Sequence, residues 1–65
     1  MPTISINGER LFVEAQTLEA LLQDQGFSGS VATAVNENFV PQTLRASHQL
    51  NEGDRVEILA PMQGG

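Results

Sequence analysis

Alternating polar and apolar residues at the start of the chain predict a β-hairpin. Residues 3–6 alternate with the period of two that is typical of a half-buried strand, and Asn7-Gly8 follows them. Both residues of this dipeptide tolerate a positive φ, which the central positions of a two-residue hairpin turn require. The return strand, residues 10–14, should point its aliphatic side chains to the same side as the isoleucines of the first strand. Phe12 then falls on the opposite side, where we expect it to be exposed.

The apolar pattern next takes the spacing of a helix. Thr17 is a favourable N-cap, and three leucines after it fall on one stripe of a helix: Leu18, Leu21 and Leu22. Gly26 stands where a left-handed residue commonly ends a helix. We therefore expect a short helix over residues 18–25, with its leucines packed on the hairpin.

Strand-like segments return after this helix. Residues 31–35 are rich in β-branched and small side chains and predict a buried strand. The polar residues 36–38 should turn the chain into a shorter strand at residues 39–40. That strand should end at Pro41, because proline has no N–H to donate to a ladder. The sequence therefore predicts a second, shorter hairpin.

The last third of the chain predicts one more strand. Residues 42–49 show neither period, so we expect an irregular segment with one helical turn, followed by Leu50 as an anchor to the core. Gly53-Asp54 predicts a turn. Residues 55–59 alternate between polar and apolar side chains, so the valine and the isoleucine of this strand should point inward.

Two strands, one helix and three strands in this order indicate an α+β domain. We expect a mixed sheet of four or five strands, with the helix packed across one face and the other face open to solvent and to partners. A ubiquitin-like β-grasp arrangement, in which the first and last strands pair in parallel at the centre, fits this order. The domain should cover residues 1–60. Residues 61–65 should form a flexible C-terminal tail, because Pro61 blocks further pairing and two glycines end the chain.

Charge and composition narrow the possible partners. Eight carboxylates oppose three arginines, lysine is absent, and the formal net charge is -5. Nucleic acid and anionic membrane surfaces would repel such a body, so we expect neither as a partner. The acidity favours solubility, or alternatively attraction to a basic partner enzyme. With no cysteine, no disulfide or thiolate metal site is possible, and the reducing cytoplasm is the expected location. We expect neither a membrane span nor a signal peptide.

The side chains predict no internal reactive site. His48 is the only histidine, so we expect no metal site and interpret it as a surface or loop residue. Carboxylates scattered over turns and strand faces are interpreted as solvated charges: Glu9, Glu14, Glu37, Glu52 and Asp54. The chain ends at Gly64-Gly65, where two residues without Cβ atoms form a thin backbone tipped by a carboxylate. The terminus is therefore the candidate reactive group.

Four segments resemble those of a known family. They are Val35-Asn36, Phe39-Val40-Pro41, residues 50–58 and the terminal Gly64-Gly65. Together with the chain length, they resemble the ThiS family, the sulfur carrier proteins of thiamine biosynthesis. The opening hairpin and the helix fit the same pattern, so the resemblance covers nearly the whole chain.

This resemblance implies a function for the C-terminus. A ubiquitin-activating-type adenylyltransferase would use ATP to activate the carboxylate of Gly65. A persulfide enzyme of a sulfur relay would then supply sulfur, leaving a thiocarboxylate from which thiazole synthase takes the sulfur. Gly65 would carry the acyl group, and Gly64 and Gln63 would thread into the partner. The chain would be a cosubstrate and not an enzyme, and would bind no cofactor itself, because the ATP is used by the partner.

Five apolar residues are candidates for the partner-binding surface: Leu59, Pro61, Met62, Phe12 and Phe39. Leu59 and Met62 flank the tail, so an enzyme that grips the tail must touch them. For the two phenylalanines a second interpretation stays open, in which Phe39 closes the core and Phe12 is a scattered surface residue.

Three alternative functions remain. Pro61-Met62-Gln63 stands where the family often has an aliphatic-rich segment, and a proline before Gly-Gly also occurs in the small subunit of molybdopterin synthase, another sulfur carrier. That subunit is usually longer than this chain. A ubiquitin-like modifier attached to lysines of target proteins is the second alternative, and an inert β-grasp interaction module is the third. The absence of lysine argues only against the building of lysine-linked chains.

Overall fold

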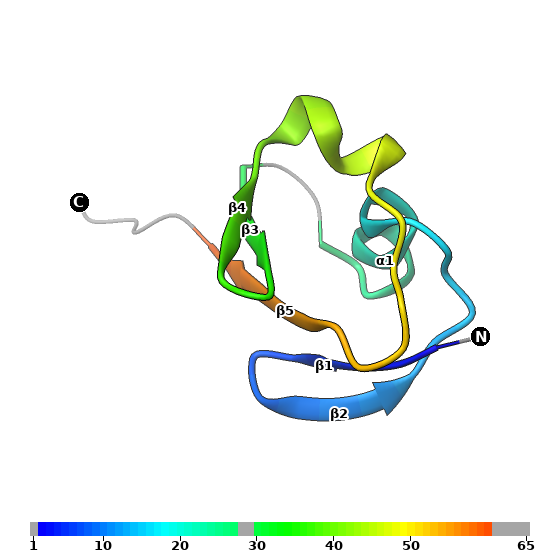
Figure 1. Ribbon diagram of the computed structural model, residues 1–65. Helices are drawn as coiled ribbons and strands as arrows, with labels where there is room; N and C mark the ends of the chain where they lie inside the picture. Colours follow the sequence, from blue (N-terminus) through cyan, green and yellow to red (C-terminus); the bar gives the residue numbers. More distant parts are fainter. Residues whose placement is uncertain (1, 28–29, 61–65) are drawn as a thin grey trace.

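The computed structural model describes residues 2–27 and 30–60 of the chain (Figure 1). These residues form five strands, an α-helix and a 3₁₀ helix. In chain order they are β1 (Thr3–Ile6), β2 (Glu9–Phe12), α1 (Leu18–Asp24), β3 (Ala32–Val35), β4 (Asn38–Val40), η1 (Gln42–Ser47) and β5 (Arg55–Leu59). The predicted order of elements is confirmed.

The five strands form one mixed sheet in the order β2-β1-β5-β3-β4. β1 and β5 pair in parallel, with Ser5 opposite Arg55, and all other neighbours are antiparallel. β5 therefore lies at the centre of the sheet, between the β1–β2 hairpin and the β3–β4 hairpin (Figure 1). This topology confirms the predicted β-grasp arrangement, and it places the strand that leads to the C-terminus in the middle of the molecule.

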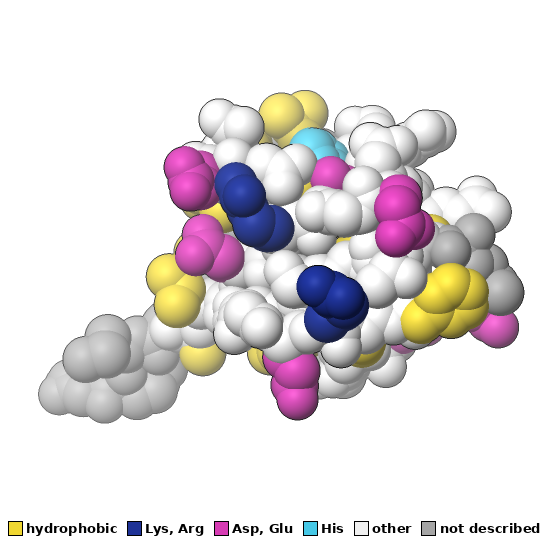
Figure 2. All heavy atoms as spheres, turned by 60° about the horizontal axis from the view of Figure 1, so that its bottom comes forward, with side chains coloured by type: hydrophobic (Ala, Val, Ile, Leu, Met, Phe, Trp, Pro, Cys, Tyr) yellow, Lys and Arg dark blue, Asp and Glu magenta, His cyan; other side chains and the backbone are white. Residues whose placement is uncertain are grey.

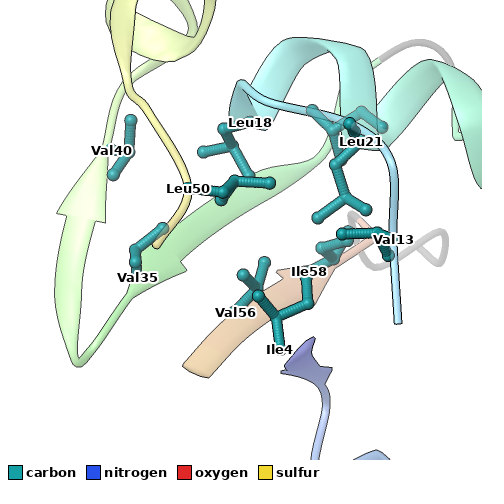
Figure 3. Packing of buried hydrophobic residues seen from close by; sticks show 11 residues of the cluster. Ile4, Val13, Leu18, Leu21, Val35, Val40, Leu50, Val56 and Ile58 are labelled. Atoms are coloured by element: carbon teal, nitrogen blue, oxygen red, sulfur yellow. The ribbon is translucent and has the colours of Figure 1, made fainter. Parts of the chain in front are cut away.

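A single hydrophobic core fills the space between the sheet and α1 (Figure 3). Its most deeply buried aliphatic side chains are Ile4, Leu18, Leu21 and Val56. In Figure 3 the leucines of α1 face the inward residues of β1, β3 and β5. Leu50 is buried among them, as predicted. The opposite face of the sheet, which we call the open face, is not covered by α1.

Local sequence signals explain the helix and the first turn. The Oγ1 atom of Thr17 accepts a hydrogen bond from the backbone N–H of Ala20 at 3.1 Å, which caps the start of α1. Gly26 follows the end of α1 with a φ of +80°, a conformation that favours glycine. Asn7 and Gly8 both have positive φ, as the hairpin requires. The predicted helix and hairpin are thus confirmed, with ends that differ by one or two residues.

The segment after β4 is more regular than predicted. Gln42–Ser47 forms a six-residue 3₁₀ helix in place of one helical turn. Arg45 explains why it is held in place, since its buried guanidinium donates hydrogen bonds to Thr33 Oγ1 at 3.0 Å and to the carbonyl oxygen of Val31. Thr33 in turn donates to the carbonyl oxygen of Val40 at 2.7 Å. Nothing in the local sequence marks Arg45 as a buried residue.

Two expectations about burial are wrong. β3 is buried only at alternate positions, because its other side chains face the open side of the sheet. Asp54 is not a solvated charge, since only 7% of it is exposed. Its carboxylate accepts hydrogen bonds from the Asn36 side chain at 2.9 Å and from the backbone N–H of Asn51 at 2.8 Å. Asp54 therefore ties the last turn to the turn between β3 and β4. Four other carboxylates are exposed, as predicted: Glu9, Glu14, Glu37 and Glu52.

Candidate functional site

The predicted site residues divide into two groups. Pro61, Met62, Gln63, Gly64 and Gly65 lie outside the described residues. The described part of the site is the end of β5 and the open face around it, which include Leu59, Phe12 and Phe39.

The end of β5 is held by Asn7. The Asn7 Oδ1 atom accepts a hydrogen bond from the backbone N–H of Ile58 at 2.9 Å, and its Nδ2 atom donates to the carbonyl oxygen of Ile58 at 3.1 Å. The side-chain amide thus takes the place of a strand residue next to β5, two residues before the last described position. Sequence reasoning recognised Asn7 only as a turn residue, because the partner strand of an asparagine side chain is not visible in local sequence.

An apolar patch lies on the open face beside the end of β5. Phe39 is 70% exposed and Leu59 is 67% exposed, so Phe39 does not close the core. Phe39 is paired with Ala34, and Leu59 is paired with Ala32. Because paired residues share a face and β3 lies between β4 and β5, these four residues are neighbours. We call them the tail-side patch: Ala32, Ala34, Phe39 and Leu59.

Phe12 does not belong to this patch. It is 61% exposed and is paired with Thr3 on β1, at the other side of the open face. The structure therefore brings Leu59 and Phe39 together near the end of β5 and separates Phe12 from them. Sequence alone could not show this separation, because it depends on the strand order.

A row of polar residues crosses the open face between these apolar groups. Arg10 on β2 and Arg55 on β5 are both paired with Ser5 on β1. Figure 2 shows two basic side chains on this face, with acidic side chains spread around them. The Nη2 atom of Arg55 lies 3.7 Å from the Oε2 atom of Glu37, and both side chains of this ion pair are largely exposed. We call Arg10, Ser5 and Arg55 the basic row.

The described side chains offer little for internal chemistry. Within residues 2–27 and 30–60, no three histidine, cysteine or carboxylate residues are grouped so that they could hold a metal ion. His48 is half-buried at the end of η1. Among the helices that the structure describes, none has the length and apolar character needed to cross a membrane.

Comparison with known sequences identifies a family. The model of the ThiS family matches residues 3–65. A sulfur carrier protein ThiS from Thermus thermophilus is 36% identical over 61 residues, which cover 92% of this chain and 95% of that protein. A thiazole synthase from Paramagnetospirillum magneticum is 44% identical over 62 residues. That match covers 92% of this chain, which spans only 19% of the length of the thiazole synthase.

Solved structures share the fold. The crystal structure of a thiamine biosynthesis protein (ThiS) from Geobacter metallireducens has a TM-score of 0.82 and 22% sequence identity, and the match covers 97% of this chain and 99% of that one. An NMR structure of a thiamine biosynthesis protein from the same organism has a TM-score of 0.80 and 22% identity, with coverage of 97% and 87%. The fold therefore agrees with the sequence matches, and the chain belongs to the ThiS family.

Proposed function

We propose that this protein is a sulfur carrier in thiamine biosynthesis and that the carboxylate of Gly65 is its reactive group. The observation that carries this proposal is the family match, which extends through Gly64 to Gly65. The Thermus relative, which matches along nearly its whole length, is named a sulfur carrier protein. The fold supports the same function, because central strand β5 leads directly to the C-terminal segment.

The chemistry begins with activation, because a free carboxylate is a poor electrophile. A Gly65 carboxylate oxygen attacks the α-phosphorus of ATP, and the bond to pyrophosphate breaks, which gives an acyl-adenylate. The terminal sulfur of a cysteine persulfide then attacks the carbonyl carbon of Gly65, and AMP leaves with the electron pair of the C–O bond. A second thiol finally reduces the acyl disulfide, forming a new disulfide with the former persulfide cysteine and releasing the thiocarboxylate.

These steps need enzymes that act on the carrier. Among the described residues no group of side chains could hold a metal ion, and we propose that the carrier supplies only the acyl group, as a cosubstrate. An adenylyltransferase would bind ATP, and a separate persulfide enzyme would deliver the sulfur. Gly64 and Gly65 lack Cβ atoms, so the backbone can approach a narrow ATP site closely.

One comparison favours thiazole formation over molybdopterin synthesis as the use of this sulfur. A segment similar to this chain occupies about a fifth of a protein named thiazole synthase. A carrier-like segment within the same polypeptide as the acceptor indicates that the two act together. We therefore propose thiazole synthase as the enzyme that takes sulfur from Gly65.

Deletion of Gly64 and Gly65 tests the reactive terminus. The truncated chain should unfold at the same urea concentration as the wild type, because the core lies within residues 2–27 and 30–60. It should not support exchange of pyrophosphate into ATP by the adenylyltransferase. Exchange at the wild-type rate with the truncated chain would show that the Gly65 carboxylate is not the reactive group.

Intact-mass measurement tests the sulfur transfer itself. After incubation with ATP, the adenylyltransferase and a persulfide donor, the wild type should gain the mass difference of one oxygen replaced by sulfur, and fragmentation should place it on Gly65. The thiocarboxylate form can then be given separately to thiazole synthase and to the large subunit of a molybdopterin synthase. Turnover only by the molybdopterin enzyme would contradict the thiamine proposal.

A further inference from the structure

The exposed positive charge of this acidic protein is concentrated in the basic row. The chain has three arginines and no lysine, and Arg45 is buried. Arg10 and Arg55 are exposed and lie on either side of Ser5, on strands that are next to β1. Residues paired across neighbouring strands point to the same face, so two guanidinium groups flank one short hydroxyl side chain.

The surface at the basic row is hollowed. An open hollow there is lined by residues that include Thr3, Ser5, Arg10, Glu52, Gly53 and Arg55. Thr3, Ser5 and Gly53 are small, so the longer arginine side chains form its sides. The Glu52 carboxylate at this site already accepts a hydrogen bond from the backbone N–H of Thr3 at 2.9 Å. The hollow therefore offers space between two cationic groups, beside one carboxylate.

Among the described residues, Arg10 has no carboxylate within ion-pair distance and Arg55 has one. Among the residues that the structure describes, the one ion pair joins Arg55 to Glu37 at 3.7 Å. The side chains of this pair are 63% and 83% exposed, and such surface pairs are weak. A carboxylate from another molecule can therefore replace Glu37, and it can be held by two parallel hydrogen bonds from a guanidinium group.

The groups beside the basic row favour a protein surface over a free anion. Phe12 lies on one side of the row, on the same strand and face as Arg10. The tail-side patch lies on the other side, beyond Glu57 on β5. Exposed aromatic residues and arginines are the types most enriched at the centres of protein interfaces. A partner that touches both apolar groups must also cover the two arginines.

We propose that the basic row receives carboxylate side chains of the adenylyltransferase that activates Gly65. This inference rests on the proposed function, and it adds the charge of the partner's contact surface. The net charge of -5 alone suggests a basic partner. Association depends on the charges that face each other at the contact, however, and on the open face both arginines are available. The contacting surface of the enzyme is therefore acidic, with apolar contacts on both sides.

A pair of double variants separates local charge from net charge. Arg10→Gln with Arg55→Gln removes two positive charges from the basic row. Gln23→Glu with Gln42→Glu changes the net charge by the same amount at exposed positions on α1 and η1, away from the open face. The measurement is pyrophosphate exchange into ATP by the adenylyltransferase at increasing carrier concentration.

The arginine variant should raise KM for the carrier by about tenfold, with kcat unchanged at saturation, because its Gly65 terminus is intact. KM for the Gln23→Glu, Gln42→Glu variant should stay within about twofold of the wild-type value. Added salt should raise KM for the wild type and have much less effect on the arginine variant. Equal KM values for the two double variants would overturn the proposal, as would a KM for the wild type that does not change with salt.

Binding measured by calorimetry distinguishes this proposal from the proposed function. If the wild type supports no exchange but its binding to the enzyme still depends on Arg10 and Arg55, the reactive-terminus proposal fails and the acidic contact stands. If exchange depends on Gly64 and Gly65 while binding does not depend on the arginines, the reactive terminus stands and the acidic contact is wrong.

Discussion

Asn7 supplies hydrogen-bond partners to β5 beyond the end of β1. Its left-handed backbone, with a φ of 51°, turns the chain away from β5 after Ile6. The backbone N–H of Asn7 still donates to the carbonyl oxygen of Val56 at 2.9 Å, and its side-chain amide makes two bonds to Ile58. One residue thus satisfies three backbone groups of the strand that leads to the C-terminus.

Replacement of Asn7 should separate its side-chain bonds from its backbone conformation. Asn7→Gly keeps the turn but removes both bonds to Ile58, and should lower the free energy of unfolding by about 1–3 kcal/mol. Asn7→Ala should lose about 1 kcal/mol more, because alanine resists the left-handed region. Urea unfolding gives both values. Asn38→Ala, which removes an exposed 3.3 Å bond, serves as the control and should lose less than about 0.5 kcal/mol. An Asn7→Gly variant as stable as the control would contradict this role.

Arg45 and Thr33 form a second residue-scale link, between η1 and β3. Arg45→Met and Thr33→Val should each reduce stability by about 1–3 kcal/mol. The first removes the donor to Thr33 Oγ1 and to the carbonyl oxygen of Val31, and the second leaves the buried guanidinium of Arg45 without its hydroxyl partner. The double variant should lose less than the sum of the two, with a coupling of about 1–2 kcal/mol measured by urea unfolding. Strict additivity of the two losses would show that the Arg45–Thr33 bond contributes nothing to stability.

At the scale of elements, α1 depends on its cap and on its packing. Seven residues are too few for a stable isolated helix, so α1 is held by its leucines and by Thr17. Thr17→Ala should reduce the free energy of unfolding by about 1 kcal/mol, while Thr17→Ser should keep most of the stability because its hydroxyl can still accept from Ala20. Thermal unfolding measures these losses. Thr43→Ala, at an exposed position of η1, is the control variant. Equal losses for the alanine and serine variants would argue against capping.

Elements with strong local patterns could be predicted from the sequence. The first hairpin follows from Asn7-Gly8, the helix from Thr17 and the leucine spacing, and β5 from its alternation. The length of η1 could not be predicted, because it depends on hydrogen bonds from Arg45 to Thr33 and Val31, which lie 12 and 14 positions earlier in the chain. Burial of Asp54 likewise depends on Asn36, which is brought near it only by the folded sheet.

The candidate site was predictable only in part, because it too depends on contacts between residues that are distant in the sequence. Alternation along the first hairpin correctly placed Phe12 outside the core. For Phe39 the pattern left two interpretations open, and its 70% exposure excludes the one in which it closes the core. The pairing of Arg10 and Arg55 with Ser5 required the strand order, which alternation within one strand cannot reveal.

At the scale of the whole molecule, the tail-side patch should matter for partners but not for folding. Phe39→Ser and Leu59→Ser remove exposed side chains, so each should change the free energy of unfolding by less than about 1 kcal/mol. Each should raise KM for the carrier with the adenylyltransferase by about tenfold or more, because an apolar contact beside the tail is lost. Leu44→Ser is a matched control, since Leu44 is 53% exposed on η1, away from the open face. A similar KM for all three variants would show that the patch is not part of the contact.

The central position of β5 also determines how the molecule bears a pulling force. A pull on the end of β5 acts along the strand, and the hydrogen bonds to β1 on one side and β3 on the other lie across that direction. All of these hydrogen bonds therefore resist the force at the same time. In a strand pulled away from the edge of a sheet, the bonds would break one after another. Under the proposed function, an enzyme that draws the chain end into a narrow channel would therefore pull on a strand that is hydrogen-bonded to a neighbour on each side.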